Sequence, residues 1–527
     1  MLTRREFLEI AGLSISLLLL HPFVAISEES VEVFPQGIAS GDPTQESILL
    51  WARIEPSVHA RLSKNLKVYV LLEGKELYKE YEVPTNYISP MNDYTVRLKI
   101  RNLLPGRTYF YVFEYAGVKR MGRFKTLPDK EVDNYSIVFI TCQNYEDGYY
   151  SAFRHIAEEE DIGFVLHLGD AIYECIYGAK IADRKLNLPS GQPCAIGLED
   201  YRHLYRTYLS DPNYQIARAM HSFIYIWDDH EFANDYYYDY DRQYWVPVSY
   251  PESIRNNREF CLRLKRASIK AWYEYTPAVV KLSADSKNPL EWISIYRNFK
   301  VGNLAHLICT DERSYRQKQC PIRYRSPGCS TQITHTMLGE EQRKWFFSRL
   351  SERNFRWKIW ANEVQFALSR IDGLYSSTDA WDGYIGERSR IIEFLKNENI
   401  DNLIVLTGDR HAFMASDIPE DFRPSYERVL GAEFMTGALS SINTSEAGWW
   451  KRDFPQYKTI EEITEVELTQ NPWIRFLNQK TWGYSVLELS KEKVRVKFYS
   501  VDKYKKQAPK SLLASLSYER GRPLMLE

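Results

Sequence analysis

The chain lacks several features that would assign it to a membrane, a nucleic acid or a nucleotide cofactor. Its 527 residues carry a formal net charge of -2, whereas nucleic-acid binding needs a clustered basic face. Beyond the amino-terminal segment, no apolar run is long enough to cross a bilayer. A Gly-x-Gly-x-x-Gly fingerprint for dinucleotides is also missing. Hydrophobic residues make up 44% and charged residues 26% of the chain, which indicates an ordinary globular protein.

Cysteine is scarce as well. The chain has 7 Cys, and an odd number leaves at least one of them outside any intramolecular disulfide. Cys142 is the candidate for that unpaired thiol. Cys320 and Cys329 flank a turn-rich stretch and are the first pair that we expect to be bridged. Two free thiols in a loop are the alternative.

The amino terminus predicts export, which would place these cysteines in an oxidising compartment. Thr3–Leu8 resembles a twin-arginine export signal, the apolar run Ala11–Leu20 follows it, and Ala25 and Ser27 offer a cleavage point. We expect residues 1–27 to be a signal peptide that engages the twin-arginine export machinery. The mature protein is then extracytoplasmic (periplasmic, wall-associated or secreted), with no stable membrane span. A membrane anchor is the disfavoured alternative, because the apolar run is short.

The length exceeds what one hydrophobic core supports, so two domains are expected. Residues 32–128 predict an all-β sandwich, because short β-rich runs alternate with turn residues. Leu103–Tyr111 resembles the strand–turn–strand of fibronectin-like sandwiches, and the polar stretch 129–134 is the expected linker. The β-rich runs are Ser47–Trp51, Lys67–Leu72, Tyr94–Ile100 and Arg107–Phe113.

Residues 135–505 predict a layered α/β domain, because apolar strands alternate with helical patterns such as Ser151–Glu160. Val494–Phe498 is expected to be a late edge strand, and residues 506–527 a C-terminal tail. The other expected strands are Tyr135–Ile140, Gly163–Leu168, Ser222–Trp227, Trp357–Trp360 and Asn402–Leu406.

Residue types that bind metals follow each of these five strands. Sites assemble at the carboxyl ends of the strands in an open α/β sheet, and five such placements together are much stronger than any one alone. The segments concerned are Thr141–Asn144, Gly169–Glu174, Asp228–Glu231, Ala361–Glu363 and Thr407–His411.

The chemistry of phosphate esters explains this pattern. Two metal ions about 3.5–4 Å apart neutralise the phosphate and supply hydroxide near neutral pH. Asp170 is the best bridging carboxylate, Gly169 permits a tight turn before it, and Tyr173 can return to the same metal from the next helical turn. The sequence therefore predicts a phosphate-ester hydrolase that uses a hydroxide activated by several metals.

Three of the motifs resemble the calcineurin-like metallophosphoesterases: Gly-Asp-x-x-Tyr, Asp-Asp-His-Glu and Gly-Asp-x-His. With Thr141–Tyr145 and His167–Glu174, they resemble the PhoD-type alkaline phosphatases and phosphodiesterases. The resemblance runs nearly end to end, through Gln36–Pro43, Thr336–Gln342 and Asp379–Tyr384. It implies a four-layer α/β core of β-sheets flanked by helices, preceded by the β-sandwich.

The resemblance also implies the metals. Thiolate and phenolate ligands suit iron, while carboxylate and amide oxygens suit calcium; other divalent metals are the alternative. Iron(III) is expected at Cys142, Asp170, Tyr173 and His411, and calcium at Asp170, Asp229, Asn362 and Asp409.

Two residues are expected to act on the substrate: His230 as phosphate contact or general acid, and Arg410 as a fork for phosphate oxygens. Asn362-Glu363 departs from the pair of amides expected there, so which of the two reaches the metal stays open. Residues expected to support the ligands are Asn144, Asp228 and Glu174, together with Glu363 where Asn362 is the ligand.

Other interpretations stay open. The rival functions are an iron-dependent redox enzyme and a non-catalytic cell-surface module stabilised by metals. The Tyr-rich stretch 236–244 is either a lid over the site or a solvated loop. The expected substrates are small phosphate monoesters or diesters, and the residues do not discriminate between them.

Overall fold

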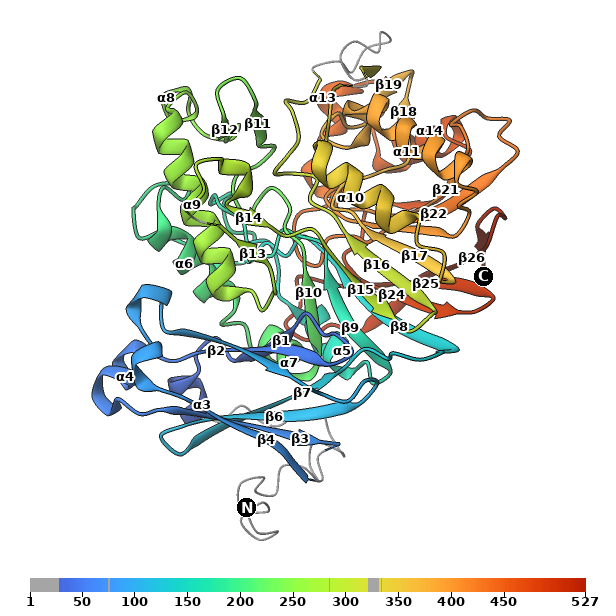
Figure 1. Ribbon diagram of the computed structural model, residues 1–527. Helices are drawn as coiled ribbons and strands as arrows, with labels where there is room; N and C mark the ends of the chain where they lie inside the picture. The colour runs from blue at the N-terminus through green and yellow to red at the C-terminus, as the bar shows by residue number, and fades with distance from the viewer. Residues whose placement is uncertain (1–27, 74–75, 284, 321–330, 333) are drawn as a thin grey trace.

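A computed structural model describes residues 28–73, 76–283, 285–320, 331–332 and 334–527 (Figure 1). The predicted signal peptide and Cys329 lie outside these residues, so the export signal and the Cys320–Cys329 bridge stay predictions. The apolar runs predicted as strands are strands in the structure, and the predicted helix is α5 (Ser151–Glu158).

The first large sheet has ten strands, in the order β27-β26-β25-β24-β8-β9-β10-β1-β2-β5. Its centre is parallel, because β8 pairs with β9 and β9 with β10 in that sense. The carboxyl ends of these three strands therefore meet at one edge of the sheet. The strands are β1 (Ile38–Gly41), β2 (Ser47–Arg53), β5 (Thr95–Arg101), β8 (Asn134–Ile140), β9 (Ile162–His167), β10 (Ser222–Tyr225), β24 (Gly483–Ser490), β25 (Lys493–Val501), β26 (Lys510–Glu519) and β27 (Met525–Leu526).

The amino-terminal strands continue this sheet, which the sequence did not predict. β1 pairs in parallel with β10, with Ser40 opposite Ser222, and β2 then pairs with β1. The Arg297 guanidinium also holds both carboxylate oxygens of Asp42 at 2.8 Å. Every residue of β2 is buried, as expected for a strand that is covered on both faces.

A separate four-stranded sheet packs against β1, β2 and β5, and together they form the predicted β-sandwich. Their shared core includes Ile48, Leu50, Val68 and Phe113. The sheet has the order β4-β3-β6-β7. Its strands are β3 (Leu66–Leu72), β4 (Glu76–Val83), β6 (Thr108–Tyr115) and β7 (Val118–Lys125), accompanied by α3 (Glu28–Val33) and α4 (Pro56–Leu62).

A seven-stranded sheet faces the ten-stranded one, in the order β15-β16-β17-β20-β22-β21-β23. Its strands β16, β17, β20 and β22 are parallel neighbours. Side chains of both sheets, including Phe139 and Ile359, form one continuous core. The strands are β15 (Arg297–Val301), β16 (Ala305–Cys309), β17 (Trp357–Ala361), β20 (Leu403–Thr407), β21 (Phe413–Pro419), β22 (Val429–Met435) and β23 (Ile474–Asn478).

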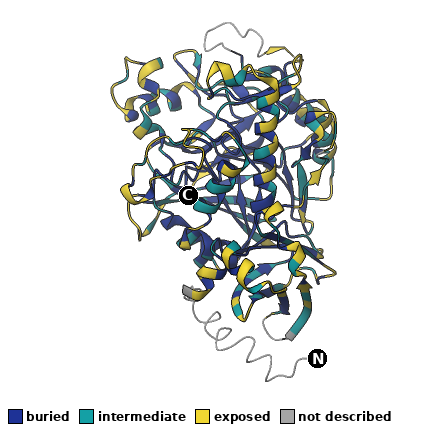
Figure 2. Ribbon diagram, turned by 90° about the vertical axis from the view of Figure 1, so that its left-hand side faces the viewer, coloured by how far each residue is buried: buried dark blue, intermediate teal, exposed yellow. Residues whose placement is uncertain are grey.

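Helices cover the outer faces of both sheets, which gives four layers and confirms the predicted fold class. α10 (Glu340–Leu350) and α11 (Ile385–Asn397) pack on the seven-stranded sheet through Phe346, Ile391 and Trp360 (Figure 1). Figure 2 shows buried residues along the sheets and exposed ones on the outward faces of helices and loops. The helices on the other side are α5, α6 (Leu198–Tyr208), α7 (Pro212–Met220) and α9 (Arg258–Tyr275).

Short elements decorate this core. The Tyr-rich stretch contains a hairpin of β11 (Tyr237–Asp239) and β12 (Tyr244–Val246). None of the helices in the described residues combines the length and apolar character needed to cross a bilayer. The other short elements are β13 (Lys281–Leu282), β14 (Ile293–Ser294), β18 (Arg370–Ile371), β19 (Leu374–Tyr375), α8 (Glu252–Arg255), α12 (Thr444–Ala447), α13 (Trp450–Asp453) and α14 (Ile460–Gln470).

The carboxyl terminus differs from the expectation. The run Val494–Phe498 lies in β25, which is not an edge strand, because β26 pairs with its other side. Residues 506–527, expected to be a tail, supply β26 and β27. The alternating polar and apolar residues of β26 fit a strand with one face on the core.

The structure adds one disulfide to the bridge that the sequence suggests. Cys175 and Cys194 form a disulfide that the sequence did not indicate. Cys142, Cys261 and Cys309 are buried and free, so the unpaired state of Cys142 is confirmed.

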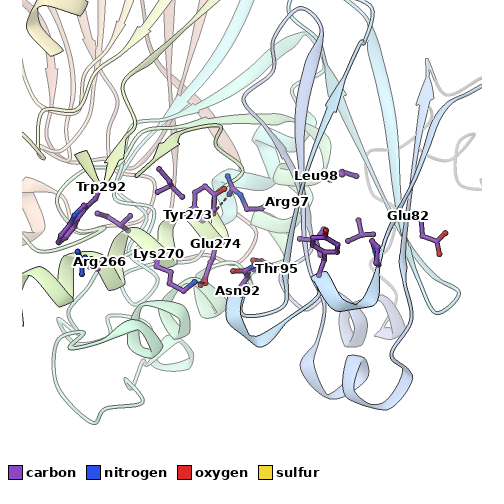
Figure 3. A pocket seen from close by; sticks show the side chains of 16 residues that line it. Glu82, Asn92, Thr95, Arg97, Leu98, Arg266, Lys270, Tyr273, Glu274 and Trp292 are labelled. Atoms are coloured by element: carbon purple, nitrogen blue, oxygen red, sulfur yellow. Dashed lines mark hydrogen bonds and ion pairs between the residues drawn. The ribbon is translucent and has the colours of Figure 1, made fainter. Parts of the chain in front are cut away.

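A cavity of about 920 Å³ lies between the sandwich and α9. Arg97, Lys270, Tyr273 and Trp292 are among the residues that line it (Figure 3). No residue predicted to bind metal or substrate is among those lining this cavity.

Candidate metal centre

The predicted metal ligands stand directly after the parallel strands, in an unusual backbone conformation. Cys142 follows β8, Asp170 follows β9, and Asp409 and His411 follow β20. All four have positive φ, at 53°, 57°, 64° and 58° respectively. Residues other than glycine rarely adopt this conformation, and such strain gathers at functional sites. Gly169 is needed because a Cβ there would lie 2.4 Å from the Asp228 backbone nitrogen.

A first group of ligands forms around Asp170. The Cys142 Sγ lies 3.4 Å from Asp170 Oδ2, and the Tyr173 hydroxyl lies 3.2 Å from the same oxygen. The Tyr173 hydroxyl is also 3.2 Å from His411 Nε2. The structure thus brings together all four residues predicted to hold iron, from three different strand ends.

His411 is oriented as a ligand. Its Nδ1 donates to the Ile442 carbonyl, which leaves Nε2 as the unprotonated nitrogen, 3.2 Å from the Tyr173 hydroxyl. Burial lowers the pKa of His411 to about 4, so the imidazole is neutral near pH 7, as a metal ligand must be.

Without a cation, burial and the charge of Asp170 disfavour the ionised forms of the Cys142 thiol and the Tyr173 phenol. Burial, and then the charge of Asp170, raises the pKa of the Cys142 thiol well above its usual range. The same two causes raise the pKa of Tyr173. A bound cation reverses this effect, because it stabilises the thiolate and the phenolate.

A second group joins Asp170 to Asp229 and His230. The Glu174 carboxylate lies 2.7 Å from His230 Nδ1 and also accepts from the Asn234 N–H at 2.8 Å. Glu174 therefore fixes the imidazole of His230 within the group. Burial alone would lower the pKa of His230, but the charges of Asp170, Glu174 and Asp229 raise it well above its usual value.

A third group consists of Asp228, Asp229 and Asp409, and the buried Arg313 lies among them. Its guanidinium binds Asp228 through Nε, Asp379 through Nη1 at 2.5 Å and Asp409 through Nη2 at 2.7 Å. Burial raises the pKa of Asp409 to about 7, although Arg313 opposes the shift.

Glu231 ties two of the loops together. Its carboxylate accepts from the backbone N–H of Asp170 at 3.0 Å, of Ala171 at 2.7 Å and of Asp228 at 2.8 Å. Because these groups come from the loops after β9 and β10, Glu231 sets the position of Asp170 relative to Asp229.

Other predicted site residues have different surroundings. The Asn362 amide donates to Val364 O and accepts from Trp381 Nε1 at 2.9 Å. Glu363 Oε1 is buried and has no hydrogen-bond partner among the described residues.

The Arg410 guanidinium binds Glu467 at 2.6 Å and Gln365 at 3.0 Å. The Asn144 amide donates to Asp147 at 3.0 Å. Asn144 lies in the loop after β8, and Asp170 lies in the loop after the neighbouring strand β9. The roles of these residues, like those of the other predicted site residues, stay predictions.

Sequence reasoning assigned no role in the site to Arg313, Glu231, Asp235 or Asp379, although Glu231 and Asp379 lie in segments that it singled out. Asp229, Asp235 and Asp379 form a further group that could hold a cation. Arg313 could have been found, because the apolar run Ala305–Cys309 is followed by Thr-Asp-Glu-Arg, the same strand-then-polar pattern as the five used.

The charge balance tests whether these residues fit metal ions. Asp170, Asp228 and Asp229 are buried, and Asp228 Oδ2 has no hydrogen-bond partner among the described residues. Among the described residues, Arg313 forms ion pairs with Asp228 and Asp409, and His230, a member of the second group, pairs with Glu174. Such an excess of buried negative charge is costly without added cations. The residues therefore fit a centre that binds more than one cation.

Comparison with known proteins agrees with this site. Residues 137–498 match the family described as PhoD-like phosphatase, and residues 23–128 match its N-terminal domain. Alkaline phosphatase D of Bacillus subtilis (strain 168) is 32% identical over 498 residues, which cover 90% of this chain and 80% of that protein. A solved structure described as that of PhoD has a TM-score of 0.78 and 28% identity, over 94% of this chain and 92% of the other. The predicted resemblance is confirmed, and the chain belongs to the PhoD-like phosphatase family of phosphoric ester hydrolases.

Proposed function

We propose that the chain is an exported hydrolase of small phosphate monoesters or diesters that depends on several metal ions. Iron(III) would be held by Cys142, Asp170, Tyr173 and His411, and calcium by Asp229 and Asp409, with Asp170 shared. One observation carries this proposal: the thiol, phenol, imidazole and carboxylate come from three strand ends, and contacts of 3.2–3.4 Å join Cys142 and Tyr173 to Asp170 and Tyr173 to His411. Thiolate and phenolate favour iron, and carboxylate oxygens favour calcium.

When bound, such metals neutralise the phosphate and supply a hydroxide nucleophile near neutral pH. The side chains of the protein supply the proton and hold the ligands in position. His230, buried beside Asp170 and oriented by Glu174, donates a proton to the leaving-group oxygen. Glu231 accepts from the backbone N–H groups of Asp170 and Asp228 and so fixes their two loops relative to each other. Arg313 holds Asp228 and Asp409 at fixed positions.

The test compares hydrolysis of a chromogenic phosphate ester by protein from its native host, before and after dialysis against a chelator. Metal analysis of the same samples identifies the ions. We expect activity to be lost with the metals and regained on their return. Asp170→Asn should lose activity together with metal. Full activity in protein stripped of all metals would contradict the proposal, and redox turnover without ester hydrolysis would favour the iron-dependent redox alternative.

The export part of the proposal has separate support. Arg4 and Arg5 stand in the segment that resembles a twin-arginine signal, and disulfides such as Cys175–Cys194 form mainly in oxidising compartments. We expect the double variant Arg4→Lys, Arg5→Lys to remain in the cytoplasm on cell fractionation. Unchanged appearance of mature protein outside the cytoplasm would show that export does not use these arginines.

A further inference from the structure

Two half-exposed aromatic rings border the metal centre. Tyr177 is 52% and Trp449 is 49% exposed. The Tyr177 ring stands edge-on to the ring of His230, with centroids 5.8 Å apart, and edge-on to Tyr173 at 6.3 Å. The Trp449 ring lies 5.9 Å from the ring of His411. Single exposed apolar residues are common on protein surfaces, but these two each adjoin a residue of the site.

The backbone next to Tyr177 is held in place. Cys175 is joined to Cys194 by the disulfide, and the Ile176 N–H donates to the Pro193 carbonyl at 2.8 Å. The same loop begins with Asp170 and Tyr173. The backbone that carries Tyr177 is therefore anchored beside His230, as a binding platform requires.

Trp449 is fixed in a comparable way. Its loop starts at Ile442, whose carbonyl orients His411, and continues through α12, which Asn443 and Glu446 cap reciprocally. Gly448 ends α12 with φ at 63°, a conformation that glycine adopts at low cost. The segment that positions His411 thus also positions Trp449.

We propose that Tyr177 and Trp449 form a subsite for an aromatic ring carried by the ester group of the substrate, an inference that rests on the proposed function. The leaving-group oxygen must approach His230 to receive its proton, and the group attached to that oxygen then lies beside Tyr177. A flat aromatic ring gains edge-to-face or offset-stacked contact with such platforms, whereas a small polyol gains little. Aryl esters are therefore preferred over glycerol esters.

The experiment measures kcat/KM for phenyl phosphate and for glycerol 3-phosphate with the metal-loaded enzyme. The intrinsic difference in reactivity between the two substrates is the same for every variant, so it cancels when this ratio is compared between variant and wild type. We expect Tyr177→Ala and Trp449→Ala each to lower this ratio by about two- to tenfold, the scale of one aromatic contact. Tyr177→Phe and Trp449→Phe keep a ring and should retain most of it. Tyr87→Ala, at a 67% exposed tyrosine that lines the cavity beside α9, is the matched control and should leave the ratio unchanged.

Direct binding of phenylphosphonate and methylphosphonate to the metal-loaded enzyme, measured by titration calorimetry, gives a second measurement that needs no turnover. The wild type should bind phenylphosphonate more tightly, and both alanine variants should reduce that preference. An equal fall for both substrates, or loss of bound metal in the variants, would overturn the subsite and make the rings structural supports of His230 and His411. An enzyme that hydrolyses neither ester would contradict the proposed function, while equal affinity for the two phosphonates would overturn the subsite alone.

Discussion

The Glu174 carboxylate lies 2.7 Å from Nδ1 of His230, and the two residues come from loops that follow neighbouring parallel strands. Burial would lower the pKa of His230, but Asp170 and then Glu174 raise it. Glu174→Gln removes one of these charges, so the pKa of His230 should fall.

For a general acid, a lower pKa moves the alkaline limb of the pH profile of kcat to lower pH. We expect this shift in Glu174→Gln, with a smaller loss for esters that have a good leaving group. Glu259→Gln, at an exposed glutamate paired with Arg263, is the control. An unchanged alkaline limb in Glu174→Gln would mean that His230 does not act as the acid.

The hydroxyl of Tyr173 lies 3.2 Å from both Asp170 and His411, so removing it should alter the first metal. Iron(III) bound to a phenolate and a thiolate absorbs visible light, and we expect protein from the native host to be coloured. Tyr173→Phe should shift or bleach the band, and Cys142→Ala should weaken iron retention. Tyr214→Phe, at a buried tyrosine paired with Tyr225, should keep the colour. A colourless, fully active enzyme with only zinc or calcium would refute the iron assignment and leave the hydrolase intact.

Arg313 joins three carboxylates with one planar fork, and lysine cannot reproduce that geometry. Each lost charged hydrogen bond costs about 1.5–3 kcal/mol. We therefore expect Arg313→Lys to lower kcat/KM by at least about tenfold and to reduce metal content, as measured by kinetics and metal analysis. Arg343→Lys, at an arginine paired with the buried Glu387 outside the site, should change neither. Normal turnover and metal content in Arg313→Lys would show that the fork is dispensable.

The burial of Lys265 should make the free energy of unfolding depend on pH. Its Nζ is buried against the rings of Phe232 and Trp227 and donates to the Tyr236 hydroxyl at 3.0 Å. Burial lowers its pKa to about 7, whereas lysine in an unfolded chain titrates near about 10.4. Between these values the unfolded chain binds a proton that the folded chain does not, so stability rises with pH. Below about pH 7 the full cost of burying the charge is present.

Lys265→Met removes this titration. We expect its melting temperature to be higher than that of the wild type. The difference should be largest near pH 6 and should shrink as the pH rises toward 10. Lys270→Met, at a half-exposed lysine paired with Glu274, should give an offset that does not change in this way. A difference for Lys265→Met that is constant between pH 6 and pH 10 would contradict the pKa of Lys265.

Much of the site could be predicted because it depends on local pattern. Apolar runs such as Tyr135–Ile140 form strands in a covered parallel sheet, and their carboxyl ends necessarily meet. That geometry brings Cys142, Asp170 and His411 together although they are far apart in the sequence. Asp170 and Tyr173 are also close in sequence, which made their shared contact easy to anticipate.

The rest depends on tertiary geometry. The pairing of Cys175 with Cys194 requires Cα atoms close enough for a bridge, which spacing alone does not reveal. β1 and β10 are far apart in the sequence, and the residues of neither strand indicate that the other is its partner. Arg410, which the resemblance implies as a phosphate contact, binds Glu467 at 2.6 Å in the structure, and a contact between residues so far apart in the sequence could not be predicted from local pattern.

The pairing of β1 with β10 has a consequence for how the chain can be shortened. Ser40 and Ser222 lie opposite each other across this pair, with their hydroxyl oxygens 3.2 Å apart. A protein trimmed to begin at residue 130 would leave β10 as an open edge, with unpaired N–H and C=O groups beside the metal centre. Open edges of this kind recruit strands from other molecules and lead to aggregation. The amino-terminal strands therefore protect the catalytic sheet from self-association.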